Sequence, residues 1–243
     1  MTFSFSTTPL ATPFQRILAI SDIHGHEQGL DLLLAEAGYD PSYDLLILGG
    51  DYIDTDPATW RILDRIIQLT TEGAIALPGN HELKLLALEG VARQNIQHHL
   101  DWLNHLPLYF AVGDFIFVHA GFRPGVLLEQ QTMRDMIEIR EAFWNSDGQA
   151  FQEDENIAGR TIVFGHTPTF KLGAPLGQPW IQPGKLGIDT GAKHRVRLTL
   201  LDLTNSISYS CSTSPEQLYL DLRRQVLQLG GSEVNRTSIP EVL

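Results

Sequence analysis

Residues 16–25 read RILAISDIHG, a short apolar run that ends in polar residues and a glycine. Two stretches of the same kind follow, DLLILGGDYID at residues 44–54 and AIALPGNHE at residues 74–82. Between them, apolar residues recur with helical spacing over residues 27–37 and 60–69. Short buried strands that alternate with amphipathic helices predict parallel pairing, with helices on the faces of the sheet.

The second half of the chain has a different pattern. Residues 108–112 and 115–119 flank Gly113-Asp114, which predicts a β-hairpin. Further strands are expected at residues 161–164, 186–189, 197–203 and 207–211, and helices at residues 83–106, 133–144 and 215–229. With no internal repeat and no linker, we expect one domain over residues 1–243. Its core would span about residues 14–212, and a C-terminal helix and tail would occupy residues 213–243.

Composition excludes several classes of protein. The chain has 243 residues, of which 43% are hydrophobic, and a net charge of −12, so it can build a core and is not disordered. Its acidity disfavours nucleic-acid binding. It has no apolar run of roughly 20 residues and no visible secretory signal, so no membrane partner is expected. A single cysteine, Cys211, fits a reducing compartment, and we expect a cytoplasmic protein.

Side chains that ligate metals follow most of the expected strands. The carboxyl ends of parallel strands share one edge of a sheet, so these side chains should converge. Carboxylate, imidazole and amide oxygen together suit manganese, iron or zinc. Asp51 lies between two sets of such residues, and a shared carboxylate is what two ions about 3.5–4 Å apart need to activate a water. The candidates are Asp22, His24, Asp51, Asn80, His119 and His166.

These motifs resemble those of the phosphoprotein phosphatase branch of the calcineurin-like metallophosphoesterases. The shared motifs are Ser-Asp-X-His-Gly, Gly-Asp-X-X-Asp, Gly-Asn-His-Glu, His-Ala-Gly and Gly-His-Thr, in that order, from Ser21 to Thr167. The resemblance implies an α/β sandwich of two mixed β-sheets packed face to face, with helices outside and a dinuclear metal site. It also implies a metal-dependent phosphoric ester hydrolase.

The resemblance assigns a role to each matched residue. Asp22, His24 and Asp51 would hold one ion. Asp51, Asn80, His119 and His166 would hold the other, with manganese expected and iron or zinc as alternatives. His81 would be the general acid that protonates the leaving oxygen, and Asp54 would orient it and favour its charged form. Asp189, in Asp-Thr-Gly, would lie next to the ligands and hold them in position without binding metal itself.

One position departs from the family pattern. Family members usually carry an arginine directly after Gly-Asp-X-X-Asp, and that arginine binds the phosphate. Here Thr55 takes its place, followed by Asp56. Arg140 resembles a phosphate-binding arginine of phage and small bacterial members, and Arg123, close after His-Ala-Gly, is a further candidate. What replaces the missing arginine stays open.

Three functions remain under consideration. The leading one is hydrolysis of phosphomonoesters, with phosphoserine or phosphothreonine in proteins, or a small phosphoester, as the substrate. The alternative is a diadenosine tetraphosphate hydrolase. That relative usually has a non-acidic residue in place of Asp54, Asp in place of Glu82, no threonine after the last histidine, and an extra segment, so the sequence favours the protein phosphatase. The third is a weakly catalytic phosphoprotein-binding module, which Thr55 suggests and the intact ligand set opposes.

Overall fold

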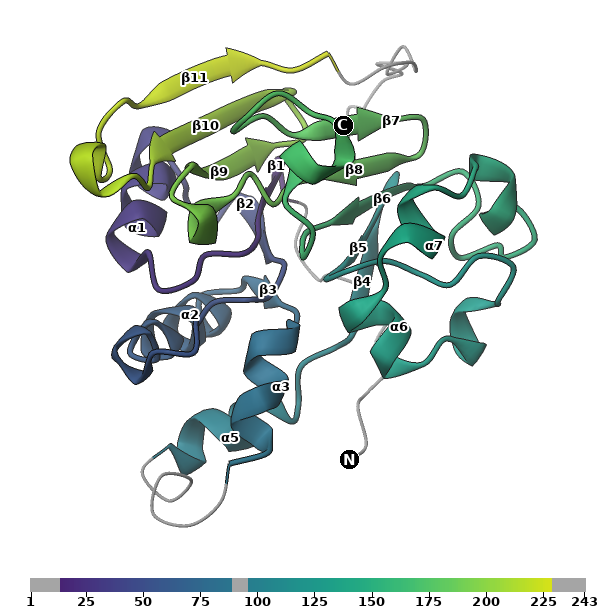
Figure 1. Cartoon of the computed structure of the whole chain (residues 1–243), viewed down its shortest axis with the longest axis horizontal. Coiled ribbons are helices and arrows are strands. Elements are labelled where there is room, and N and C mark those ends of the chain that lie inside the picture. The colour runs from purple at the N-terminus through teal and green to yellow at the C-terminus, as the bar shows by residue number, and fades with distance from the viewer. Residues whose placement is uncertain (1–13, 89–95, 229–243) are drawn as a thin grey trace, which may run out of the picture.

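Two mixed β-sheets form the centre of the protein (Figure 1). The computed structural model describes residues 14–88 and 96–228. The first sheet has six strands in the order β11-β10-β9-β1-β2-β3. Their bounds are β1 Arg16–Ile20, β2 Asp44–Leu48, β3 Ile75–Ala76, β9 Arg197–Asp202, β10 Ile207–Ser212 and β11 Arg223–Val226. Strands β1, β2 and β3 pair in parallel, as the opening pattern predicts, and β9, β10 and β11 extend the sheet antiparallel.

The second sheet has five strands in the order β4-β5-β6-β8-β7. Its strands are β4 Tyr109–Val112, β5 Phe115–Val118, β6 Thr161–Phe164, β7 Trp180–Gln182 and β8 Lys185–Gly187. Strands β5, β6 and β8 are parallel, so their carboxyl ends lie at one edge. The hairpin of β4 and β5 is confirmed, and β7 has no counterpart among the predicted strands.

Alternating residues of β1, β2, β5 and β6 enter different cores. Ile17 and Ile47 of the first sheet pack with Phe117 and Val163 of the second, so the two sheets share an apolar layer. The opposite face of the first sheet is covered by α1 (Glu27–Glu36), α2 (Ile62–Thr71) and α5 (Gln97–Leu103). The opposite face of the second sheet is covered by α6 (Met133–Glu138) and α7 (Glu141–Trp144). The predicted sandwich of two mixed sheets with helices outside is confirmed.

Two long predicted helices are shorter in the structure. The helix predicted over residues 83–106 corresponds to α3 (Asn80–Leu86) and α5, and residues 89–95 lie outside the described part. The helix predicted over residues 133–144 is divided into α6 and α7 at Ile139 and Arg140. This break places Arg140 at the start of α7.

The predicted C-terminal helix at residues 215–229 is wrong. A short 3₁₀ helix at Pro215–Gln217 is followed by β11, which pairs antiparallel with β10. Tyr219 and Asp221 have φ angles of 59° and 51°, which a helix cannot contain, and the free edge of β10 offers hydrogen bonds that a detached helix would not use. The expected tail beyond residue 228 lies outside the described residues. Among the helices that the structure describes, none is long and apolar enough to cross a bilayer.

Candidate metal centre

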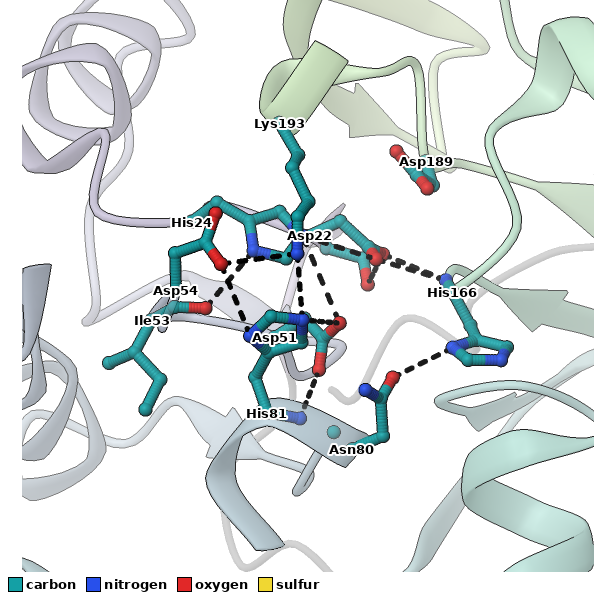
Figure 2. Close-up of polar contacts among 12 residues, drawn as sticks. Asp22, His24, Asp51, Ile53, Asp54, Asn80, His81, His166, Asp189 and Lys193 are labelled. Carbon is teal, nitrogen blue, oxygen red and sulfur yellow. Dashed lines mark hydrogen bonds and ion pairs between the residues drawn. The ribbon is translucent and has the colours of Figure 1, made fainter. Parts of the chain in front are cut away.

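Residues that follow five strands meet at one site, where Figure 2 labels the predicted ligands other than His119. Asp22 and His24 follow β1, Asp51 follows β2, and Asn80 begins α3 after β3. His119 and His166 follow β5 and β6 of the second sheet. Two groups of possible ligand atoms form there, Asp22–His24–Asp51 and Asp51–His119–His166, and the atoms within each group lie within 4.8 Å of one another. The structure therefore brings together the predicted ligands, with Asp51 common to both groups.

The backbone is held in an unusual conformation at this site. Asp22, His24, Asp51 and His166 have φ angles of 54°, 48°, 53° and 66°, a left-handed region that costs a non-glycine residue about 1–3 kcal/mol. Neighbouring glycines make room for these side chains. A Cβ on Gly79 would lie 2.2 Å from Asp51 Oδ1, and a Cβ on Gly165 would lie 2.1 Å from Asp22 Oδ2. These glycines are needed because the ligand oxygens occupy the space of a side chain.

Two histidines are oriented by backbone carbonyls. His24 Nδ1 lies 3.0 Å from the oxygen of Ile53, and His119 Nδ1 lies 2.8 Å from the oxygen of Gly49. Because a carbonyl only accepts, each Nδ1 carries the hydrogen and each Nε2 keeps its lone pair. His24 Nε2 lies 3.8 Å from Asp51 Oδ2, and His119 Nε2 lies 3.5 Å from Asp51 Oδ1. His119 Nε2 is buried without a hydrogen-bond partner, as expected of a metal ligand.

Asn80 and His166 contribute a further pair of donor atoms. His166 Nδ1 lies 2.9 Å from Asn80 Oδ1. Two ligand atoms that each lie about 2.1 Å from one ion are themselves about 3 Å apart. The pair therefore has the spacing of two ligands of the ion on the His119 side.

The charges at the site call for cations. Burial raises the pKa of Asp22 well above its usual range, and the nearby carboxylates of Asp189 and Asp51 add to this effect. Burial also raises the pKa of Asp51 to about 7. Burial lowers the pKa of His24 to about 3 and that of His119 to about 4, so these rings are neutral. Crowded carboxylates and neutral imidazoles are the donor set that divalent ions require, so the residues fit two such ions.

Glu82 positions the backbone of the site, a role that the sequence did not reveal. This fully buried carboxylate accepts hydrogen bonds from the backbone N–H of Asp51 at 2.8 Å, of Tyr52 at 2.8 Å and of Gly79 at 2.9 Å. The available signal was its place at the third position of α3, where a glutamate caps the start of a helix. Glu82 thus joins the loops that carry Asp51 and Asn80.

His81 and Asp54 meet as predicted, and a third residue joins them. His81 Nδ1 lies 3.6 Å from Asp54 Oδ1. Lys193 Nζ lies 2.9 Å from His81 Nε2 and 3.1 Å from Asp54 Oδ1 (Figure 2). Burial, together with the charge of Lys193, lowers the pKa of His81 to about 4. Asp54 favours the charged form of His81, as predicted, but burial and Lys193 outweigh it, so His81 is neutral at pH 7. Lys193 was missed, although it closely follows the Asp189-Thr190-Gly191 motif.

The remaining predicted residues lie at different places. Arg140 Nη1 lies 3.3 Å from Thr167 Oγ1, and its charge lowers the pKa of His166, after burial and His119. Arg123 instead pairs with Asp135, and it forms no hydrogen bond or ion pair with any of the six predicted ligands. Asp189 is buried, and its carboxylate accepts a hydrogen bond from the N–H of Gly191 at 2.9 Å. Its charge raises the pKa of Asp22, so it lies close to that ligand.

A sequence profile described as calcineurin-like phosphoesterase matches residues 15–189. This chain belongs to that family. The match covers the strand ends that carry all six predicted ligands. The phosphoesterase is 32% identical over 124 residues to a symmetrical bis(5'-nucleosyl)-tetraphosphatase of Aromatoleum aromaticum, with 45% of each chain covered. It is 34% identical over 121 residues to the protein of the same name from Dechloromonas aromatica, with 44% of each chain covered. The aligned part therefore spans just under half the length of these relatives.

Solved structures share the fold of the phosphoesterase. One that is provisionally described as a diadenosine tetraphosphatase superposes with a TM-score of 0.65 and 21% identity, over 84% of this chain and 97% of that one. A protein serine/threonine phosphatase from Saccharomyces cerevisiae superposes with a TM-score of 0.57 and 14% identity, over 82% of this chain and 73% of that one. At these identities the likeness concerns the fold alone.

Proposed function

We propose that this chain is a two-metal hydrolase that cleaves the polyphosphate chain of dinucleoside polyphosphates such as diadenosine tetraphosphate. The observation that carries the two-metal part is Asp51, whose carboxylate belongs to both groups of ligand atoms. Six donors from both sheets would hold the ions: Asp22, His24, Asp51, Asn80, His119 and His166. When bound, the ions would supply a nucleophile from water and charge stabilisation for the phosphoryl group.

The relatives support this substrate over a phosphoprotein. The curated relatives described above carry the name of a symmetrical bis(5'-nucleosyl)-tetraphosphatase, although the alignments cover under half of their length. The sequence details at Asp54 and Glu82 favoured a protein phosphatase. The structure gives Glu82 a role in holding the backbone, so its identity is a weaker guide to substrate than it is in the sequence alone.

The protonation state of His81 also favours a dinucleoside polyphosphate over a phosphoprotein as the substrate. Hydrolysis of a phosphoanhydride releases a phosphate oxygen that is stable as an anion near neutral pH. Hydrolysis of a phosphoserine releases an alkoxide, which must gain a proton as it departs. His81 is neutral and contacts a cation at Nε2, so it has no proton to give from that nitrogen. A leaving group that needs no proton fits this arrangement better.

The residues of this chain would act on the substrate in distinct ways. Arg140 lies at the rim beside Thr167 and would bind phosphate oxygens through its guanidinium. Glu82 would keep the loops of Asp51 and Asn80 in place while charge moves at the site. Attack of one water at the central anhydride of diadenosine tetraphosphate would break one P–O bond and give two molecules of ADP.

A protein phosphatase remains the second candidate, because of one contact. Asp54 lies 3.6 Å from His81 Nδ1, and a carboxylate beside a histidine favours its protonated form once the opposing cation moves away. A substrate that displaced Lys193 from His81 would allow this. The same site would then serve ester hydrolysis.

A substrate panel separates the two functions. The protein would be loaded with Mn²⁺ and assayed with diadenosine tetraphosphate, a phosphoserine peptide and p-nitrophenyl phosphate. We expect the highest kcat/KM for diadenosine tetraphosphate, with ADP as the product and neither ATP nor AMP formed. Faster hydrolysis of the phosphopeptide would favour the protein phosphatase. His119→Ala is the matched control, because activity that survives it comes from a contaminant.

A further inference from the structure

The loop that follows β2 offers no cation for a phosphate group. Thr55 is exposed, and its backbone N–H donates to Asp54 Oδ1 at 2.7 Å. The Asp56 carboxylate accepts from the N–H of Ala58 at 2.9 Å and caps the short 3₁₀ helix Pro57–Thr59. The carboxylates of Asp54 and Asp56 make this loop negative, so phosphate binding needs a positive charge from elsewhere.

Lys193 brings a positive charge to this loop from the opposite side of the site. It lies in the 3₁₀ helix Ala192–His194, in the connection between β8 and β9. Its backbone is fixed on both sides, because Thr213 Oγ1 donates to the oxygen of Ala192 at 3.1 Å and Gly191 accepts from the N–H of Val196 at 3.1 Å. The lysine side chain extends from this anchored turn towards His81 and Asp54 (Figure 2).

The ammonium group of Lys193 has one N–H that can still donate a hydrogen bond. It has three N–H bonds, of which one points to His81 Nε2 at 2.9 Å and one to Asp54 Oδ1 at 3.1 Å. The side chain is 37% exposed, and no further hydrogen bond or ion pair within the described residues uses its third N–H. Lys84 also acts on His81 through its charge, but it forms no hydrogen bond with His81 or Asp54.

We propose that Lys193 is a phosphate-binding residue, which supplies from the β8–β9 connection the cation that related enzymes place directly after Gly-Asp-X-X-Asp. Its ligand is a phosphoryl oxygen of the substrate, and this assignment rests on the function proposed above. A lysine offers a point charge where an arginine offers a two-pronged fork. The hold on phosphate is therefore weaker and less dependent on orientation than the arginine would give.

Inorganic phosphate is the direct probe of this assignment. Its dissociation constant for the Mn²⁺-loaded protein would be measured by calorimetry, and its Ki by inhibition of p-nitrophenyl phosphate hydrolysis. Lys193→Met keeps the length of the side chain and removes the charge. We expect both constants to rise about 10–100-fold, the usual effect of losing a hydrogen bond to a charged group. Lys171→Met removes the same charge from an exposed side chain and should leave both constants within about twofold.

Moving the positive charge from residue 193 to residue 55 tests the assignment of Lys193 more sharply. In the double variant Thr55→Arg/Lys193→Met the positive charge returns to the position used by relatives, and we expect phosphate affinity to recover by at least about tenfold over Lys193→Met. Lys193→Arg should retain phosphate binding. If Lys193 only positioned His81, Lys193→Met would lower kcat and leave the phosphate constants unchanged, and this would overturn the proposal.

The assignment is separable from the identity of the substrate. Phosphate binding by calorimetry needs no turnover, so failure to cleave diadenosine tetraphosphate would leave the assignment of Lys193 standing. A wild-type protein that did not bind phosphate would overturn it, as would unchanged constants in Lys193→Met. Because Lys193 is partly exposed, the variant should fold, and an unchanged melting temperature would verify this.

Discussion

The buried carboxylate of Glu82 accepts a hydrogen bond at 2.8 Å from the backbone N–H of Asp51, the residue that both groups of ligand atoms share. The same carboxylate accepts from the N–H of Gly79, directly before Asn80. One side chain that ligates nothing therefore ties together two loops that do. Metal binding and folding should be linked through it.

Glu82→Gln should weaken both metal binding and the stability of the fold. The amide replaces an acceptor oxygen by a donor that faces backbone N–H groups, so at least one hydrogen bond to a charged group is lost. We expect the free energy of unfolding of the Mn²⁺-loaded protein to fall by about 2–3 kcal/mol at pH 8 in urea titrations, with loss of bound metal. In chelator the effect should be smaller, because burial and the Asp51 carboxylate raise the pKa of Glu82 to about 7. Glu36→Gln, on the exposed face of α1, should change it by less than about 0.5 kcal/mol. A Glu82→Gln protein as stable as Glu36→Gln would contradict this role.

The effect of His81→Asn should depend on the leaving group. An alkyl phosphate would need to displace Lys193 before His81 could act as a general acid, and for such a substrate the loss in kcat should be about 10²–10⁴-fold. For p-nitrophenyl phosphate or diadenosine tetraphosphate the leaving oxygen barely needs a proton, so the loss should be smaller. Steady-state kinetics on all three substrates check this. Equal losses would argue that His81 orients the substrate and donates no proton.

Substitution of Arg140 should raise KM, whereas substitution of Arg123 should not, because the two residues lie in different surroundings. Arg140→Ala removes the guanidinium at the rim of the site and should raise KM by about tenfold or more, with a similar rise in the Ki of phosphate. Arg123→Ala breaks the pair between the exposed Arg123 and the buried Asp135, away from the six predicted ligands, and should leave KM unchanged within about twofold. If the two variants behaved alike, Arg123 would reach the substrate from a position that the structure does not show.

Asp189→Asn should stabilise the metal-free protein in a pH-dependent way. Burial raises the pKa of Asp189 to about 7, against about 3.9 for an unfolded aspartate. The folded state therefore holds a proton that the unfolded state has released, and this contribution to stability is present below pH 4 and is lost as the pH rises through 7. Asparagine carries no such charge. The free energy of unfolding of Asp189→Asn should therefore exceed that of wild type by nearly zero at pH 4 and by roughly 2–4 kcal/mol at pH 8.

Urea unfolding of both proteins in chelator, across that pH range, measures the difference. The asparagine keeps an oxygen that can accept from the N–H of Gly191, so the comparison isolates the charge. An advantage that was constant from pH 4 to pH 8 would show that the carboxyl does not titrate differently in the two states.

The strands and the converging ligands were the most predictable part of this molecule. β1 and β2 form at the apolar starts of the stretches 16–25 and 44–54, because each is a short apolar run followed by polar residues or glycine. The ligands follow from the strands, since parallel strands bring their carboxyl ends to one edge. A motif at a strand end thus predicts a position in space as well as a residue type.

The predictions that were wrong or missing concern features that depend on contacts between residues distant in sequence. β11 forms because β10 has a free edge, and the leucines at residues 218–222 do not reveal that edge by themselves. Lys193 lies 112 residues from His81 in the chain, and nothing in the intervening sequence indicates that they meet. Glu82 is part of a recognised motif, but its four backbone donors become visible only when the loops are placed in space.

Anomalous diffraction from crystals grown with Mn²⁺, combined with metal analysis of the same protein, tests the central claim most directly. The account predicts two ions per chain, about 3.5–4 Å apart, with Asp51 bound to both, and loss of activity on chelation that added Mn²⁺ restores. A single ion, two ions that do not share Asp51, or full activity in metal-free protein would contradict it.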